Sequence, residues 1–101
     1  MSNVIYFNTY QLVDGASVPD FLLALEKLIK ESISKQKGFV SFKLLAEDDA
    51  WADYCMFETM DDLHAFLDSA QNSESVLAEK FYSFLNFSTC SSHIYTVEMS
   101  S

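Results

Sequence analysis

The first predicted strand, residues 4–13, has no polar face, and this feature limits the possible folds more than any other. Alternate residues of a strand point to opposite sides, which gives one row of Val4, Tyr6, Asn8, Tyr10 and Leu12 and a second row of Ile5, Phe7, Thr9, Gln11 and Val13. A sheet with one solvated face shows apolar residues alternating with polar ones. Both faces of this strand must therefore be buried against other parts of the protein or a partner. The predicted strand at residues 39–46 is also apolar on both faces.

A helix is predicted to follow the Asp14-Gly15 turn. Ser17 with Asp20 resembles a capping box, and Pro19 lies in the first turn, where its missing N–H costs nothing. Apolar residues at helical spacing then form one buried stripe: Val18, Phe21, Leu22, Leu25, Leu28, Ile29 and Ile33. The spacing predicts an amphipathic helix. Lys35, Lys37 and Gly38 suit its C-terminal end.

The second half of the chain repeats a strand followed by a helix. Residues 39–46 and 51–58 are predicted to form a hairpin around the acidic turn at 47–49. Thr59 with Asp62 repeats the capping pattern before a helical stripe that includes Leu63, Phe66 and Leu67. A polar break at 69–75 interrupts this helix, and Ser73 is the predicted cap of a further helix. Residues 86–98 form the predicted last strand.

This order of elements predicts an α+β, ferredoxin-like β-α-β-β-α-β fold in one domain, residues 1–101. Its antiparallel sheet carries helices on one face only. The other face is also apolar here, and an apolar face larger than a few hundred Å² usually marks an interface. We therefore expect a homodimer in which two sheets pack face to face.

The amino-acid composition disfavours several classes of binding partner. Fifteen acidic residues, six lysines and no arginine give a formal charge of −9, so we expect no nucleic acid partner. Without the planar fork of arginine, tightly held anionic substrates are disfavoured. No apolar run approaches the ~20 residues that span a bilayer, and the N-terminus shows no leader pattern, so we expect a cytoplasmic protein. Cys55 and Cys90 are expected to be free thiols.

The chain resembles the dimeric α/β-barrel superfamily, and within it the antibiotic-biosynthesis-monooxygenase-like domains. The resemblance covers residues 4–98 and rests on Lys37-Gly38-Phe39 at the start of a strand, on Phe57-Glu58 before an acidic helix start, and on the split second helix. It implies a dimeric α/β barrel with a pocket between sheet and helices. It also implies either a cofactor-independent monooxygenase acting on a phenolic molecule or a domain without catalysis.

The resemblance also points to residues. Asn8 falls at the asparagine position that is functional in the haem-degrading branch, but Phe66 takes the tryptophan position and the histidine position falls near Phe81. Because a haem iron would lack its axial ligand, we do not expect haem degradation, and we expect no cofactor. Asn8 is the candidate catalytic residue, and its amide would hold a phenolate or peroxide oxygen. The alternative is that it only satisfies backbone groups.

Four aromatic residues are the candidate substrate-binding residues: Tyr6, Tyr10, Phe66 and Phe81. Core packing is the alternative for each of them. His64 shares a helix face with Asp61 and Asp68, which suits either a base with orienting partners or an ordinary solvated face. Glu58 could act as a base or assist the helix dipole. Histidine and cysteine never fall at ligand spacing, so no metal site is predicted. The two open hypotheses are an oxygenase of a small apolar or phenolic molecule and a non-catalytic ligand-binding or assembly domain.

Overall fold

The computed structural model describes residues 3–72 and 75–101. Its elements run in the order β1 (Val4–Leu12), α1 (Val18–Glu31), η1 (Ile33–Lys35), β2 (Phe39–Ala46), β3 (Trp51–Phe57), α2 (Met60–Asn72), α3 (Val76–Tyr82) and β4 (Leu85–Thr96). This is the predicted sequence of strands and helices, including the split second helix.

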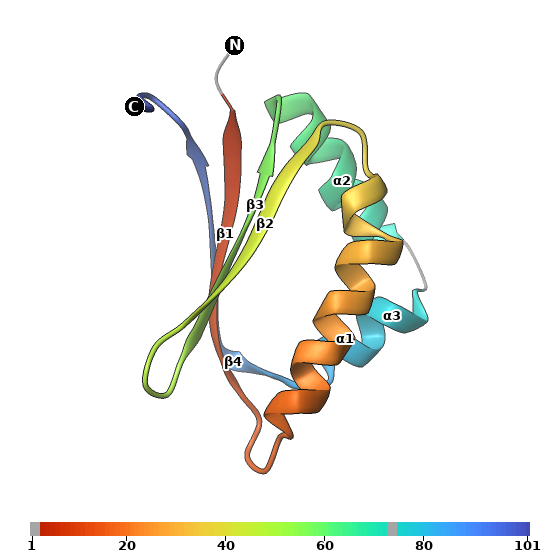
Figure 1. Cartoon of the computed structure of the whole chain (residues 1–101). Coiled ribbons are helices and arrows are strands. Elements are labelled where there is room, and N and C mark those ends of the chain that lie inside the picture. The colour runs from red at the N-terminus through yellow and green to blue at the C-terminus, as the bar shows by residue number, and fades with distance from the viewer. Residues whose placement is uncertain (1–2, 73–74) are drawn as a thin grey trace.

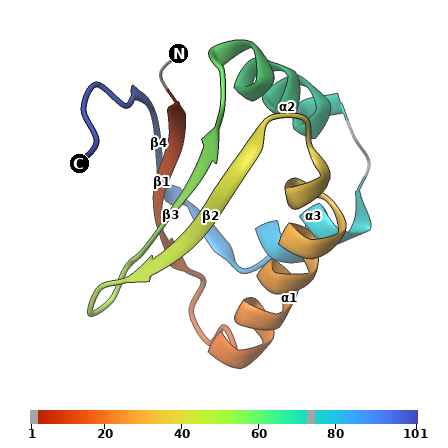
Figure 2. The same cartoon turned by 45° about the horizontal axis from the view of Figure 1, so that its top comes forward.

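The four strands form one antiparallel sheet in the order β2-β3-β1-β4. The helices α1, α2 and α3 all lie on the same side of it (Figure 1). After a rotation of the view, the opposite face of the sheet is still free of helices (Figure 2). The predicted ferredoxin-like α+β fold is therefore confirmed.

Side-chain caps set the start of each helix. The Ser17 hydroxyl accepts a hydrogen bond from the Asp20 amide at 3.3 Å, and the Thr59 hydroxyl accepts from the Asp62 amide at 3.0 Å. The last helix is capped by Ser75, whose hydroxyl accepts from the Ala78 amide. These bonds satisfy N–H groups that have no partner within the helix. The predicted cap, Ser73, lies outside the described residues.

Some predicted boundaries differ from the structure. The first helix ends at Glu31, and Ile33 belongs to the separate 3-10 turn η1. The second helix continues to Asn72, so the polar break is shorter than residues 69–75. Gly38 has a φ of +80° as expected, but it connects η1 to β2 instead of closing α1. A Cβ at this position would collide with the Asp62 carboxylate, so close approach and backbone conformation both require glycine.

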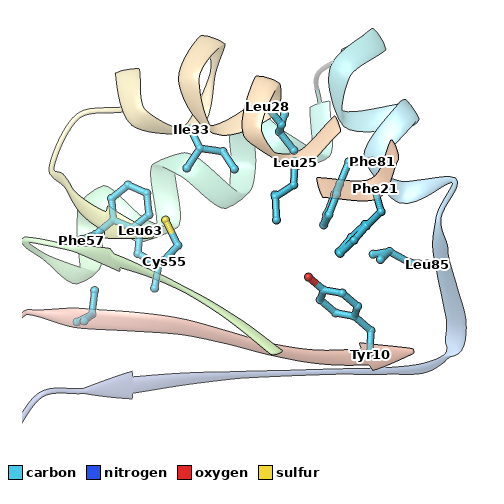
Figure 3. Packing of buried hydrophobic residues seen from close by; sticks show 11 residues of the cluster. Tyr10, Phe21, Leu25, Leu28, Ile33, Cys55, Phe57, Leu63, Phe81 and Leu85 are labelled. Atoms are coloured by element: carbon cyan, nitrogen blue, oxygen red, sulfur yellow. The ribbon is translucent and has the colours of Figure 1, made fainter. Parts of the chain in front are cut away.

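The core lies between the sheet and the helices. Phe21, Phe57 and Leu63 are completely buried there, and Figure 3 shows the buried side chains of the sheet and helices facing one another. The two rows of β1 side chains face opposite sides of the sheet, as predicted. Val4 and Tyr10 of the first row are buried on the helix side. Ile5 and Phe7 therefore lie on the helix-free face.

Candidate functional site

A cavity of about 280 Å³ lies between the sheet and the helices. Its walls are mainly apolar, and the helical side chains among them include Leu25, Leu28, Phe66 and Phe81. The sheet supplies Asp53 together with Tyr6, Asn8, Tyr10 and Ser92. An apolar pocket with a few polar groups gathered in one place is the usual form of a small-molecule site.

The polar groups form a row across three strands. Asn8 of β1 lies directly opposite Asp53 of β3 and, on its other side, opposite Ser92 of β4. The Ser92 hydroxyl donates to Asn8 Oδ1 at 2.6 Å, and Asn8 Nδ2 donates to Asp53 Oδ1 at 2.9 Å. Because the serine bond occupies the amide oxygen, the Asn8 amide is held with its N–H groups toward Asp53.

Tyr10 supplies the second hydrogen bond to the same carboxyl group. Its hydroxyl donates to Asp53 Oδ2 at 2.6 Å, a short distance typical of a donor to a charged oxygen. The Tyr10 ring makes edge-on contacts with Phe21 and Phe81, with 6.3 Å between ring centroids in both cases. Figure 3 shows the hydroxyl pointing from β1 into the space below α1. Aromatic packing therefore fixes the position of this donor.

Asp53 is the most unusual residue of the site, since its side chain is only 4% exposed. Burial raises the pKa of the Asp53 carboxyl, while the hydrogen bonds from Tyr10 and Asn8 act in the opposite direction without cancelling the effect. A carboxylate has about four lone-pair sites and these two donors occupy two of them. The remaining sites can accept a proton from a ligand in the cavity.

The neighbouring acids hold their protons more firmly than usual. Burial, followed by the nearby Asp53 charge, raises the pKa of Tyr10. The same two causes raise the pKa of the buried Cys55 thiol to about 12. The Tyr10 hydroxyl therefore serves as a donor, and the Asp53 carboxyl is the group of this row that accepts.

The structure brings together all five residues that were selected from the sequence. Tyr6, Asn8, Tyr10, Phe66 and Phe81 line the same cavity. Their roles toward a ligand stay predictions. Phe81 and Tyr10 also belong to the buried core, while Tyr6 and Phe66 are partly buried beside it. Packing and cavity lining are thus compatible in these residues.

Two other candidates, His64 and Glu58, lie elsewhere, and so does the second histidine, His93. His64 is exposed on α2, and Glu58 is exposed before that helix, with its amide donating to the Gly38 carbonyl. His93 lies opposite Phe7 on β4 and stacks on Tyr95, with ring centroids 6.0 Å apart. None of the three lines the cavity. Cys55 and Cys90 are free thiols, as predicted.

Asp53 was missed by the sequence reasoning. It belongs to the row Trp51, Asp53, Cys55 and Phe57, which alternation assigns to one face of β3, and three of its members are strongly apolar. A carboxylate within a core-facing row is costly to bury without partners. This position was therefore a detectable signal of a functional site.

Within residues 3–72 and 75–101, no three histidine, cysteine, aspartate or glutamate side chains gather in a way that could hold a metal ion. The helices in that same part of the chain are all too short or too polar to cross a membrane.

Comparisons with known proteins identify the fold. No family model matches the sequence, and no curated protein matches it significantly. Among solved structures, SnoaB, a cofactor-independent oxygenase from Streptomyces nogalater, is similar with a TM-score of 0.78 at 17% identity, covering 99% of this chain and 97% of its own. A candidate antibiotic biosynthesis monooxygenase from Nitrosomonas europaea gives 0.73 at 14% identity, covering 95% and 90%.

A dimeric ferredoxin-like protein from an uncultured marine organism is also similar, with a TM-score of 0.69 at 10% identity over 100% of this chain and 92% of its own. This chain therefore has the fold of the antibiotic-biosynthesis-monooxygenase-like domains, as the sequence resemblance implied. At such low identities the similarity concerns the fold.

Proposed function

We propose that this protein binds a small phenolic or enolisable aromatic molecule and oxygenates it without a cofactor, with Asp53 as the base. The observation that carries the proposal is a buried carboxyl group with two fixed hydrogen-bond donors at the wall of an apolar cavity. A base is most effective when its pKa approaches the working pH, and burial raises the pKa of Asp53 in that direction.

The reaction begins with proton transfer from the substrate to Asp53. For a substrate with an acidic CH2 group beside an aromatic ring, the resulting carbanion reduces dioxygen and forms a C–O bond, giving a hydroperoxide after protonation. Loss of water then leaves a carbonyl group. One substrate CH2 and one O2 give one C=O and one H2O, so dioxygen is the only oxidant required.

Asn8, Tyr10 and Ser92 act on Asp53 in this scheme. Asn8 and Tyr10 orient the carboxylate, and Ser92 orients Asn8. The Asn8 amide has two N–H groups and only one of them is given to Asp53. The second is the candidate donor to a substrate oxygen, which keeps the role in ligand binding that the sequence predicted. Phe66 and Phe81 serve as walls for the ring.

Anthrone is a suitable test substrate because the reaction converts it to anthraquinone and water. Oxygen uptake above the uncatalysed rate is expected for the native chain, with a rate that rises with pH as Asp53 loses its proton. Asp53→Asn should abolish uptake while retaining ligand binding, and Asp48→Asn, in the exposed hairpin loop, is the control for the loss of one charge. Anthrone binding without any uptake by the native chain would support the non-catalytic alternative.

The helix-free face of the sheet supports a second part of the proposal, a homodimer. On this face lie Ile5 and Phe7 of β1, with Tyr54 of β3 opposite Phe7. Tyr95 of β4 contacts Phe7 edge-on at 6.3 Å and is 52% exposed, and Leu45 of β2 is 44% exposed. Lys43 and His93 lie on the same face, opposite Tyr54 and Phe7, and the apolar side chains between them favour burial against a second copy. The similar marine protein is itself dimeric.

A further inference from the structure

A second hollow adjoins the cavity. It has a volume of about 290 Å³ and is lined by Tyr6, Phe66, Leu67, Ala70 and Tyr82. Three of these residues, Tyr6, Phe66 and Tyr82, also line the cavity that contains Asp53. The two spaces therefore meet at these three side chains.

The junction is built from three different elements. Tyr6 comes from β1, Phe66 from α2, and Tyr82 from the end of α3. Phe66 is held by stacking on the buried Phe57, with ring centroids 5.2 Å apart. The Tyr82 ring lies 5.6 Å from Phe81 and is 42% exposed. One side of the junction is thus fixed by the core, and the other side borders solvent.

The two spaces differ in polarity. The row of Ser92, Asn8 and Asp53 supplies hydrogen-bonding groups in the first cavity. Beyond the junction, the second hollow is bordered by Leu67 and Ala70 of α2 and contains no charged lining residue. A ligand that occupied both spaces would need a polar ring at one end and an apolar part at the other.

We propose that the second hollow is a subsite for an apolar substituent, so that the ligand is a phenol with an alkyl or aryl extension. This inference rests on the proposed function, because it places the phenolic end at Asp53. The extension passes between Tyr6, Phe66 and Tyr82 and lies against Leu67 and Ala70. Each methylene buried there adds roughly fourfold to the affinity.

Equilibrium binding of 2-naphthol and 6-butyl-2-naphthol, followed by calorimetry, tests the subsite. The butyl compound is expected to bind the native chain tenfold or more tightly than 2-naphthol, in line with about 0.8 kcal/mol for each buried methylene. Ala70→Leu fills the hollow from an exposed helix position where leucine is well tolerated. It should remove most of that advantage and leave 2-naphthol binding unchanged.

Ala65→Leu is the matched control, because Ala65 is exposed on the same helix and lines neither space. It should affect neither ligand. Leu67→Ala, which removes contacts instead of space, should also weaken only the butyl compound. If Ala70→Leu leaves the butyl advantage intact, or weakens both ligands equally, the subsite is refuted while the proposed function stands. If neither naphthol binds the native chain, the phenolic ligand class fails and the subsite fails with it.

Discussion

Replacing Asp53 with asparagine should make the protein more stable, and the gain should grow with pH. Burial raises the pKa of the folded Asp53 above that of the unfolded chain, where aspartate titrates near about 3.9. The folded state therefore binds its proton more tightly. This tighter proton binding contributes to the free energy of unfolding. The contribution is fully present below the pKa of the unfolded chain and is lost as the pH rises through the pKa of the folded state.

The slope follows from proton linkage. Between the two pKa values, native Asp53 costs the folded state about 1.4 kcal/mol for each pH unit relative to a group that does not titrate. For a domain of this size, 1 kcal/mol corresponds to roughly 4–8 °C in Tm. Asparagine can keep a contact with both partners, because its oxygen accepts from Asn8 while its amide donates to the Tyr10 oxygen, with the Tyr10 hydroxyl proton then losing its Asp53 acceptor. The variant should therefore fold normally.

The assay is thermal unfolding by circular dichroism of the native chain and Asp53→Asn, from about pH 4 to about pH 8. The Tm of Asp53→Asn should rise relative to that of the native chain by roughly 6–11 °C for each pH unit, and the difference should become constant above the pKa of folded Asp53. Every other carboxylate is common to both proteins, so its contribution cancels. Asp48→Asn, in the exposed hairpin loop, is the control for the loss of one charge. If the Tm of the two proteins changes equally with pH, or if the Tm of the native chain rises relative to that of Asp53→Asn, Asp53 is not a buried acid whose ionisation destabilises the fold.

Three further changes test other parts of the structure. Tyr10→Phe removes the donor to Asp53 Oδ2 and should lower the free energy of unfolding by about 1–3 kcal/mol. The pH midpoint of oxygen uptake should move up, because a hydrogen bond that favours the ionised carboxylate is lost. An unchanged midpoint, measured with an oxygen electrode, would argue against a direct effect of Tyr10 on Asp53. Phe7→Lys places a charge on the helix-free face and should convert the proposed dimer to a folded monomer in native mass spectrometry. A dimer that persists would show that the copies pair elsewhere. Gly38→Ala should destabilise the chain in urea by on the order of 1–2 kcal/mol from its left-handed backbone alone. The Asp62 side chain adds a cost that Asp62→Ala relieves only in part, because the Asp62 Cβ, 2.7 Å from the added Cβ, remains. Equal losses with and without Asp62→Ala would remove the carboxyl group from the explanation.

The fold was predictable because local signals agreed with one another. Ser17 and Thr59 mark helix starts by short-range hydrogen bonds, and the order of strands and helices follows from these boundaries and the spacing of apolar residues. The end of α1 was harder to predict from the sequence, because Ile33 continues the apolar spacing although it already belongs to η1, where the chain turns toward β2. Periodicity reports which face a residue occupies, but it does not report the hydrogen bonding that ends a helix.

The site was only partly predictable. Alternation on β1 was enough to place Tyr6, Asn8 and Tyr10 on one face, and all three line the cavity. The pairing of Asn8 with Asp53 depends on the register of β1 against β3, which no short sequence pattern sets. The register of β1 against β4 shifts between Thr9 and Gln11, so the position of Ser92 also needed the structure. The carboxylate between Trp51 and Cys55 is visible in the sequence without the register, and it is the proposed base.

The polar row joins residues from three distant parts of the chain, and this has a consequence for biosynthesis. Asn8 and Asp53 are separated by 45 positions, and Asn8 and Ser92 by 84. Synthesis proceeds from the N-terminus, so a growing chain on the ribosome contains Asn8 and Asp53 well before it contains Ser92, which orients Asn8. β1 cannot acquire its second neighbour until the C-terminal strand has emerged, and pairings of such long sequence separation form slowly. Binding competence should therefore appear only once β4 has joined the sheet beside β1.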